Sequence, residues 1–288
     1  MPRTIPANCL AAAILLGIFP TPQGFAQAPV AIAPGSPAPS YADLADLADR
    51  APLVARVDIR EAVRLRPEQA PGLPGGMARV YVKARTRAVL LGESIGESVS
   101  YLADVTLDPK GKLPKLKKTT TLIFARIAPA RPGELQLVST AGQIAWSQPV
   151  EDRVRAILTE LVAPDAPPRI TGVREVSFVP GNLIGEGETQ IFLNTEGGDP
   201  VSISVVHRPG APPVWGVAFG EIVDQAVRPP LRDTLAWYRL ACFLPAGVSS
   251  ATNLSGDGEA QRIAAQDYRY VRGQLGSCPR TLAGAARR

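Results

Sequence analysis

Apolar and polar residues alternate along much of the chain, which is typical of β-strands with one buried face. In the first half, a short helix is expected over 41–50 with Ser40 as its cap, and a second helix runs from Ser147 to the stop at Pro164. Between them, segments rich in β-branched and apolar residues are separated by glycine and proline clusters; they cover 53–63, 78–91, 98–107, 119–127 and 134–146. Five strands with flanking helices predict a small closed barrel of the oligonucleotide/oligosaccharide-binding type or a short sandwich, and the strand count alone does not choose.

The second half repeats the strand pattern and ends in helices. Prolines cluster over 164–168 and indicate a boundary between two lobes, at 40–163 and 165–283. Four segments follow, over 169–179, 188–194, 201–207 and 214–223, and their short connections favour an antiparallel meander. A helix capped by Asp233 reaches Cys242, and a last helix spans 258–275. The predicted class is mainly β with flanking helices, α+β.

The N-terminus has the pattern of a secretory signal peptide. Arg3 precedes an apolar run from Cys9 to Phe19, and small residues follow up to Ala26, where we expect cleavage. The apolar run is about half the roughly 20 residues that a membrane-spanning helix needs. Residues 27–39 are rich in proline and alanine and read as a tether. We therefore expect a soluble periplasmic protein that does not span the membrane, or alternatively an extracellular one.

Composition narrows the chemistry. The 288 residues carry a net charge of +5, too mild a basic excess to require a nucleic-acid partner. One histidine and three cysteines exclude zinc-finger arrays and iron–sulfur clusters, and neither a metal nor a cofactor motif is present. Cleavage removes Cys9 and leaves Cys242 and Cys278, which we expect to form a disulfide in an oxidising compartment.

One pattern points weakly to hydrolysis. Residues 92–96 match the G-x-S-x-G nucleophile motif around Ser94, and His207 lies downstream in the order such hydrolases use. The motif requires a helix after the serine, whereas residues 98–107 read as a strand. His207 shares the buried face of its strand and is more typical of a hydrogen-bonded structural residue than of a general base or a pH-sensitive contact. Paired carboxylates remain an open alternative, because their pairing is spatial.

Two segments are candidate binding surfaces. Five lysines fall on one predicted hairpin tip, at Lys110, Lys112, Lys115, Lys117 and Lys118. Such a cluster can contact phosphate-bearing lipid or lipopolysaccharide, or it is simply a solvated tip. No aromatic residue lies among these lysines to stack on bases, so nucleic acid is not expected.

The second segment is the glycine-rich loop over 180–189. Its polar candidates are Asn182, Glu186 and Glu188, and the two acids would repel phosphate but could meet a cation or an arginine. The alternative is a plain turn between two strands.

Two resemblances complete the sequence evidence. The second lobe resembles uncharacterised secreted proteins of Gram-negative bacteria, a likeness that implies no activity, through residues 180–183, 188–193 and 233–242. The first lobe resembles the netrin/TIMP-type variant of the oligonucleotide-binding barrel, through residues 54–57, 80–82 and 90–92. That family fixes its N-terminus with cysteines, and the mature first lobe has none, so protease inhibition is not carried over.

These observations predict a binding or protein-interaction module of the cell envelope. The expected partner is an envelope protein, a glycan or a lipid. The alternatives are an envelope hydrolase that uses Ser94 with His207 or unassigned carboxylates, and a binder of anionic surfaces through Lys110 to Lys118.

Overall fold

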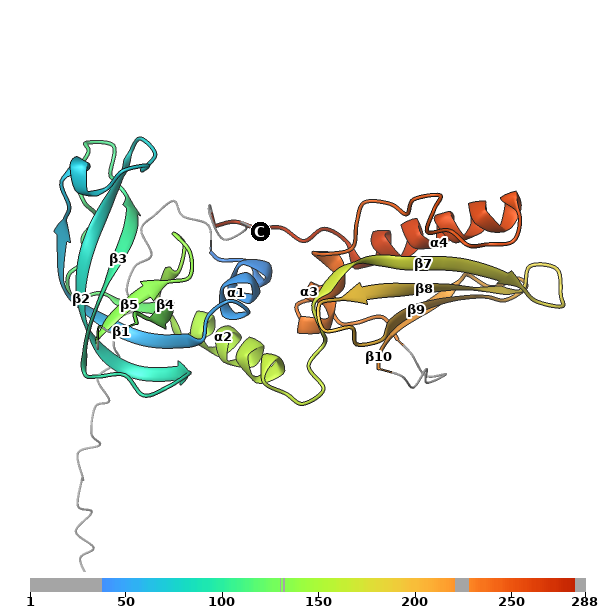
Figure 1. Cartoon of the computed structure of the whole chain (residues 1–288), viewed down its shortest axis with the longest axis horizontal. Helices are drawn as coiled ribbons and strands as arrows, with labels where there is room; N and C mark the ends of the chain where they lie inside the picture. Colours follow the sequence, from blue (N-terminus) through green and yellow to red (C-terminus); the bar gives the residue numbers. More distant parts are fainter. Residues whose placement is uncertain (1–37, 130, 132, 221–227, 283–288) are drawn as a thin grey trace, which may run out of the picture.

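The computed structural model describes residues 38–129, 131, 133–220 and 228–282. In these ranges a barrel lies beside a second sheet, with helices between them (Figure 1). The mainly β, α+β class expected from the sequence is confirmed. The predicted signal peptide over 1–26 and all but the last two residues of the predicted tether lie outside the described residues.

Five strands close the barrel, so the structure decides for a barrel over a sandwich. Their order around the ring is β1-β2-β3-β5-β4, and β4 pairs again with β1. Every pair in the ring is antiparallel except β3–β5, which is parallel. The strands are β1 (Leu53–Arg64), β2 (Met77–Leu91), β3 (Ser98–Thr106), β4 (Thr120–Ile127) and β5 (Glu134–Leu137), with a short 3₁₀ helix, η1 (Pro67–Gln69), between β1 and β2.

The sequence predicted one strand over 134–146, and this prediction is wrong, because the segment forms two short strands. β5 ends at Leu137, and β6 (Gln143–Ala145) pairs with the other side of β4. A turn separates them, in which the N–H of Gly142 donates to the carbonyl of Ser139 at 3.0 Å. A side chain at Gly142 would start 3.0 Å from the carbonyl of Phe124, so the turn packs directly on β4.

The second sheet is the antiparallel meander that the sequence predicts. Its order is β10-β9-β8-β7, and α4 (Gly258–Leu275) packs against β7 and β8. The strands are β7 (Ile170–Pro180), β8 (Gly187–Thr195), β9 (Val201–His207) and β10 (Val214–Phe219). The last strand was expected to reach Val223, and residues 221–227 lie outside the described residues.

Three helices join the two halves into one body. They are α1 (Tyr41–Ala48), α2 (Gln148–Leu161) and α3 (Leu235–Ala241), and they lie between the barrel and the second sheet (Figure 1). All eight residues of α1 are buried. One apolar cluster runs from Val54 and Phe124 on the barrel, through these helices, to Ile203 in the second sheet. The barrel interior forms a separate cluster. The two predicted lobes therefore share a core.

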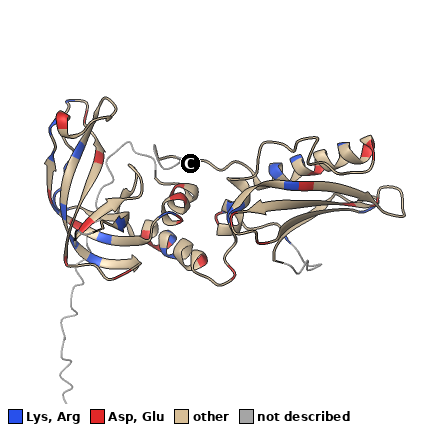
Figure 2. Ribbon diagram, in the orientation of Figure 1, with Lys and Arg blue, Asp and Glu red and all other residues tan. Residues whose placement is uncertain are grey.

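Carboxylates of α1 and its C-cap residue fasten this junction. Asp46 accepts hydrogen bonds from the Tyr238 hydroxyl at 2.5 Å and from Arg280 at 2.6 Å. Asp49 accepts two from Arg239, at 2.9 and 2.8 Å. Arg239 is only 4% exposed, and the carboxylate of Asp49 balances its buried positive charge. Elsewhere, charges of both signs are spread over the barrel and the second sheet (Figure 2).

The two ends of α3 are fixed by a capping threonine and by a disulfide. Asp233 was expected to cap the helix, but the cap is Thr234, whose hydroxyl accepts a hydrogen bond from the N–H of Trp237 at 3.2 Å. Asp233 instead takes a left-handed conformation, with φ of 58°. At the other end, Cys242 forms the predicted disulfide with Cys278.

None of the helices in the described part of the chain has the length and apolar character needed to cross a membrane.

Candidate functional site: a groove between two strands of the barrel

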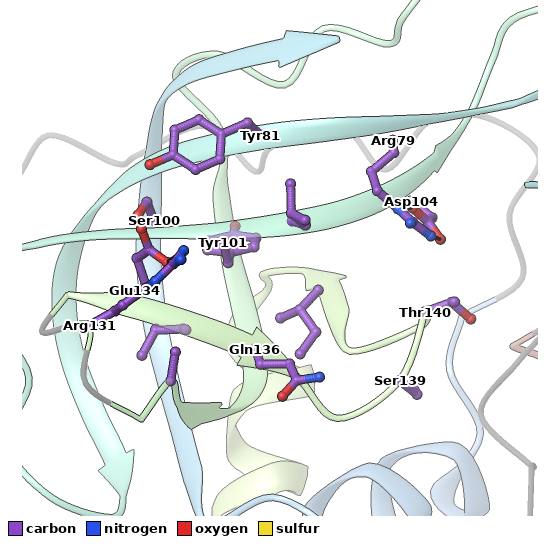
Figure 3. A pocket seen from close by; sticks show the side chains of 14 residues that line it. Arg79, Tyr81, Ser100, Tyr101, Asp104, Arg131, Glu134, Gln136, Ser139 and Thr140 are labelled. Carbon is purple, nitrogen blue, oxygen red and sulfur yellow. Dashed lines mark hydrogen bonds and ion pairs between the residues drawn. The ribbon is translucent and has the colours of Figure 1, made fainter. Parts of the chain in front are cut away.

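The groove exists because β5 leaves β3 after a short contact. The two strands pair only through Ser100 with Glu134 and Tyr101 with Leu135, while β3 continues beside β2 to Thr106. Past this contact the strands diverge, and a groove of about 590 Å³ opens between them (Figure 3). Its walls come from β2, β3, β5, the β4–β5 connection and the β5–β6 turn; they include Arg79, Tyr81, Leu102, Asp104, Arg131, Gln136, Ser139 and Thr140.

An apolar row crosses the outer surface of the barrel and reaches the groove. Val63 on β1 pairs with Tyr81 on β2, which pairs with Leu102 on β3, so the three side chains share the outward face. Val63 is 49% and Leu102 47% exposed. Tyr81 and Leu102 line the groove. Contiguous apolar side chains at a concave, solvent-open site indicate a contact surface.

Charged and polar groups form the rim of the groove. Arg79 donates two hydrogen bonds to Asp104, at 2.7 and 2.9 Å, in a fork geometry. These hydrogen bonds raise the pKa of Arg79 above its ordinary value. At the end where β3 and β5 meet, Arg131 pairs with Glu134 at 3.2 Å. The Arg79–Asp104 pair lies opposite Thr140, across the mouth of the groove (Figure 3).

The floor of the groove reaches toward the barrel interior. Tyr101 is 2% exposed, and its hydroxyl donates to Oε1 of Gln143 at 2.8 Å. Burial holds the pKa of Tyr101 well above its ordinary value, so the phenol stays neutral. Leu135 and Leu137 add apolar surface beside it. The arrangement therefore combines an apolar floor with a polar rim, which suits binding. Among the described residues no cluster of histidine, cysteine and carboxylate side chains suits a metal ion.

The five lysines singled out from the sequence lie elsewhere, on the β3–β4 connection over 107–119. All five are exposed, and none forms an ion pair with a described residue. Leu113 and Leu116 of the same loop pack against the core of the barrel. The carboxylate of Asp108 accepts hydrogen bonds from the N–H groups of Lys110 and Lys112, at 2.9 and 2.8 Å. The lysines are thus presented on an anchored, internally bonded loop.

The acidic loop candidates belong to the β7–β8 hairpin of the second sheet. Asn182 is exposed, while the carboxylate of Glu186 folds back and accepts the N–H of Leu183 at 3.2 Å. Glu188 lies on β8 and accepts a hydrogen bond from Gln190. Glu186 also lines a second groove, of about 550 Å³, between this hairpin and α4. None of these three residues is part of the barrel groove.

Ser94 and His207 are not brought together. Ser94 is exposed on the β2–β3 connection of the barrel, and β3 rather than a helix follows it. His207 ends β9 in the second sheet, where its Nε2 lies 2.8 Å from Oδ2 of Asp267. That buried oxygen also accepts the hydroxyl of Thr189 at 2.5 Å. The placement gives the serine form of the hydrolase alternative no support.

The groove residues were not singled out from the sequence, although two of them interrupt a pattern. In β3 the inward residues are apolar and the outward ones are Ser98, Ser100, Asp104 and Thr106, so Leu102 is the apolar exception. In β2 the outward residues around Tyr81 are Arg79, Lys83 and Arg85. The two exceptions become neighbours only once the register of β2 against β3 is known.

Comparison with known proteins adds no assignment. No protein-family model matches the sequence, and no curated protein is similar to it. The case for a function therefore rests on the geometry of the barrel groove.

Proposed function

We propose that the protein is a soluble periplasmic binding or protein-interaction module of the cell envelope, and that the groove between β3 and β5 is its binding site. One observation carries the proposal. Tyr81 and Leu102, two apolar side chains in an otherwise polar outward register, stand side by side in a groove with a charged rim. A pocket of this size with apolar walls and a few placed polar groups is typical of a ligand site.

Two features support the proposal that the protein is periplasmic. The order of charge, apolar run and small residues over 1–26 is that of a secretory signal peptide. The Cys242–Cys278 bridge suits an oxidising compartment such as the periplasm. The partner in that compartment is an envelope protein, a glycan or a lipid.

Native mass spectrometry of protein purified from a periplasmic extract tests this proposal. The groove variant is Leu102→Glu, and the matched control is Leu254→Glu, an exposed leucine of the other half. We expect a co-purifying mass with the wild type and with Leu254→Glu, and its loss with Leu102→Glu. A ligand retained equally by all three proteins, or bare protein in all three, contradicts the proposal.

The lysine loop supports a second candidate function, binding to an anionic surface. Its five lysines are exposed, lack acidic partners among the described residues, and stand on an anchored loop. Positive charge held in this way attracts phosphate-bearing surfaces, by about 1 kcal/mol for each lysine near the surface. The loop does not line the groove.

Sedimentation with vesicles of phosphatidylglycerol and phosphatidylcholine tests this second function. Replacing the five lysines by glutamine should abolish binding, whereas replacing them by arginine should preserve it and its salt dependence. Equal binding of both variants contradicts a role for the loop.

A further inference from the structure

β3 is paired on both sides only near its beginning. β2 runs beside the whole of β3, whereas β5 pairs only with Ser100 and Tyr101. The N–H of Ser100 donates to the carbonyl of Gly133, at the start of β5, at 2.8 Å. Backbone groups alternate in direction along a strand. Even-numbered residues of β3 therefore turn their N–H and C=O groups toward the β5 side, and odd-numbered residues turn theirs toward β2.

Two even-numbered residues lie beyond the end of the β5 contact. Within the described residues, no backbone hydrogen bond engages the N–H or C=O of Asp104 or Thr106. Consecutive residues of a strand rise about 3.3 Å, so the two sets of groups repeat at roughly 7 Å. The edge of β3 is thus unpaired at Asp104, which lines the groove, and at Thr106 just beyond it, with donors and acceptors available for pairing.

We propose that the groove takes an extended polypeptide segment, which adds to the free edge of β3 as a further strand. The inference rests on the proposed function of the groove and names its partner. A peptide backbone in extended conformation presents alternating N–H and C=O groups at the same repeat as the edge of β3. Exposed edges recruit other chains in this way unless they are blocked.

The residues that line the groove determine which side chains the bound segment needs. Successive side chains of a strand point to opposite faces. Every second residue of an added strand therefore faces the floor that Tyr101, Leu135 and Leu137 provide. The residues between them face outward, beside the Arg79–Asp104 pair. The groove selects a segment with apolar residues at alternate positions.

Short peptides selected from a random display library on the disulfide-intact protein are the probe. Methylating each peptide N–H in turn should weaken binding by about tenfold at alternate positions and leave the positions between them unchanged, because only alternate groups face β3. In the complex, amide hydrogen exchange at Asp104 and Thr106 should slow, whereas Val105, whose groups face β2, should not change. A library that yields no peptide with these effects overturns the proposal.

A variant of the protein tests the edge directly. Thr106→Pro removes one N–H from the free edge of β3, two residues beyond Asp104 of the groove wall, and leaves the pairing with β2 intact, because that pairing uses the backbone groups of odd-numbered residues. We expect about tenfold weaker peptide binding for Thr106→Pro and wild-type binding for Thr106→Ala. Equal affinity of the two variants contradicts strand addition. If Thr106→Pro does not fold, the methylation series and the exchange rates decide the question on the wild type.

The outcomes separate this inference from the function on which it rests. A glycan or lipid that co-purifies with the wild type and is lost with Leu102→Glu retains the groove as a binding site and rejects strand addition. Peptides that bind Leu102→Glu as tightly as the wild type place their site outside the groove and reject strand addition as well. Bare protein in every sample rejects the proposed function itself.

Discussion

The hydroxyl of Tyr238 donates a hydrogen bond to Oδ1 of Asp46 at 2.5 Å, across 192 positions of the sequence. It joins α3 to α1, and Arg280 binds the same carboxylate from the segment after α4. Tyr238 is 1% exposed, so this is a buried hydrogen bond to a charged group. Such bonds contribute more than those between neutral groups.

Tyr238→Phe should therefore lower the free energy of unfolding by about 2 kcal/mol. Urea unfolding, followed by circular dichroism, measures the change. The control is Tyr270→Phe, because the Tyr270 hydroxyl donates only to the backbone carbonyl of Pro213, at 3.1 Å, and we expect a loss below about 1 kcal/mol there. Equal losses in the two variants would contradict a special role for the Asp46 contact.

Acid should weaken the junction between the two halves. Burial disfavours ionisation of Asp49, but the hydrogen bonds and charges of Arg239 and Arg169 outweigh it and hold the pKa of Asp49 below its ordinary value. The pKa of Asp43 is also lowered, since the hydrogen bonds from Thr281 and Ser40 outweigh its burial. A carboxyl group with a lowered folded pKa stabilises the protein above its unfolded value of about 4, and this contribution is lost as the pH falls through the folded pKa.

We therefore expect the urea midpoint to be constant between about pH 5 and pH 6 and to fall below about pH 4. Asp49→Asn cannot titrate at this position, so its midpoint should be lower at pH 6 and fall less steeply in acid. Asp165→Asn, at an exposed position without a hydrogen-bond partner among the described residues, should follow the wild type. A wild-type acid slope in Asp49→Asn would contradict this account.

The two glycines that flank Ser94 should respond differently to alanine. Gly92 has φ of +100°, and a Cβ there would lie 2.4 Å from the carbonyl oxygen of Pro52. A Cβ on Gly96 would meet nothing closer than 3.8 Å. We expect Gly92→Ala to cost more than about 2 kcal/mol of stability and Gly96→Ala less than about 1 kcal/mol, as measured by urea unfolding. Similar costs would show that the close approach to Pro52 is relieved by movement.

Removing the disulfide should destabilise the protein strongly. Cys242 and Cys278 are separated by 36 positions, and closing a loop of this length stabilises a fold by roughly 4 kcal/mol on the chain-entropy model. The double variant Cys242→Ala/Cys278→Ala should lose about this amount in urea unfolding. A reducing agent should shift the wild type toward the double variant and leave the double variant unchanged; an unshifted wild type contradicts the prediction.

The sequence predicts the elements well where a local rule decides them. β9 over 201–207 and α4 over 258–275 follow directly from alternation and from helical spacing, and the structure adds Asp257 as the cap of α4. The break between β5 and β6 was missed because residues 134–146 were read as one strand, although Ser139, Thr140 and Gly142 between the two apolar parts are residues that favour turns. The packing of Gly142 against β4 fixes the turn there. Thr234 was missed as a cap because Asp233 beside it is an equally good cap by residue type.

The groove could not be predicted because it depends on where a pairing ends. Leu102 and Tyr81 are visible in the sequence as apolar residues in outward register, but their adjacency follows from the β2–β3 register. The open edge at Asp104 and Thr106 follows from the short length of β5, which the single strand expected over 134–146 did not anticipate. Both are tertiary properties, and local propensity carries no information on them.

The contacts that bury α1 also constrain the order in which parts of the protein can fold. This helix is the first element of the described chain, yet Tyr238, Arg239 and Arg280, which bind the carboxylates of Asp46 and of the C-cap Asp49, follow 190 or more positions later. A chain that leaves the ribosome in sequence order presents α1 long before the residues that bind these carboxylates have been made. α1 can pack on α2 and the barrel as soon as these exist, but the buried carboxylates gain their partners, and the junction is complete, only after residues 238–280 have been synthesised.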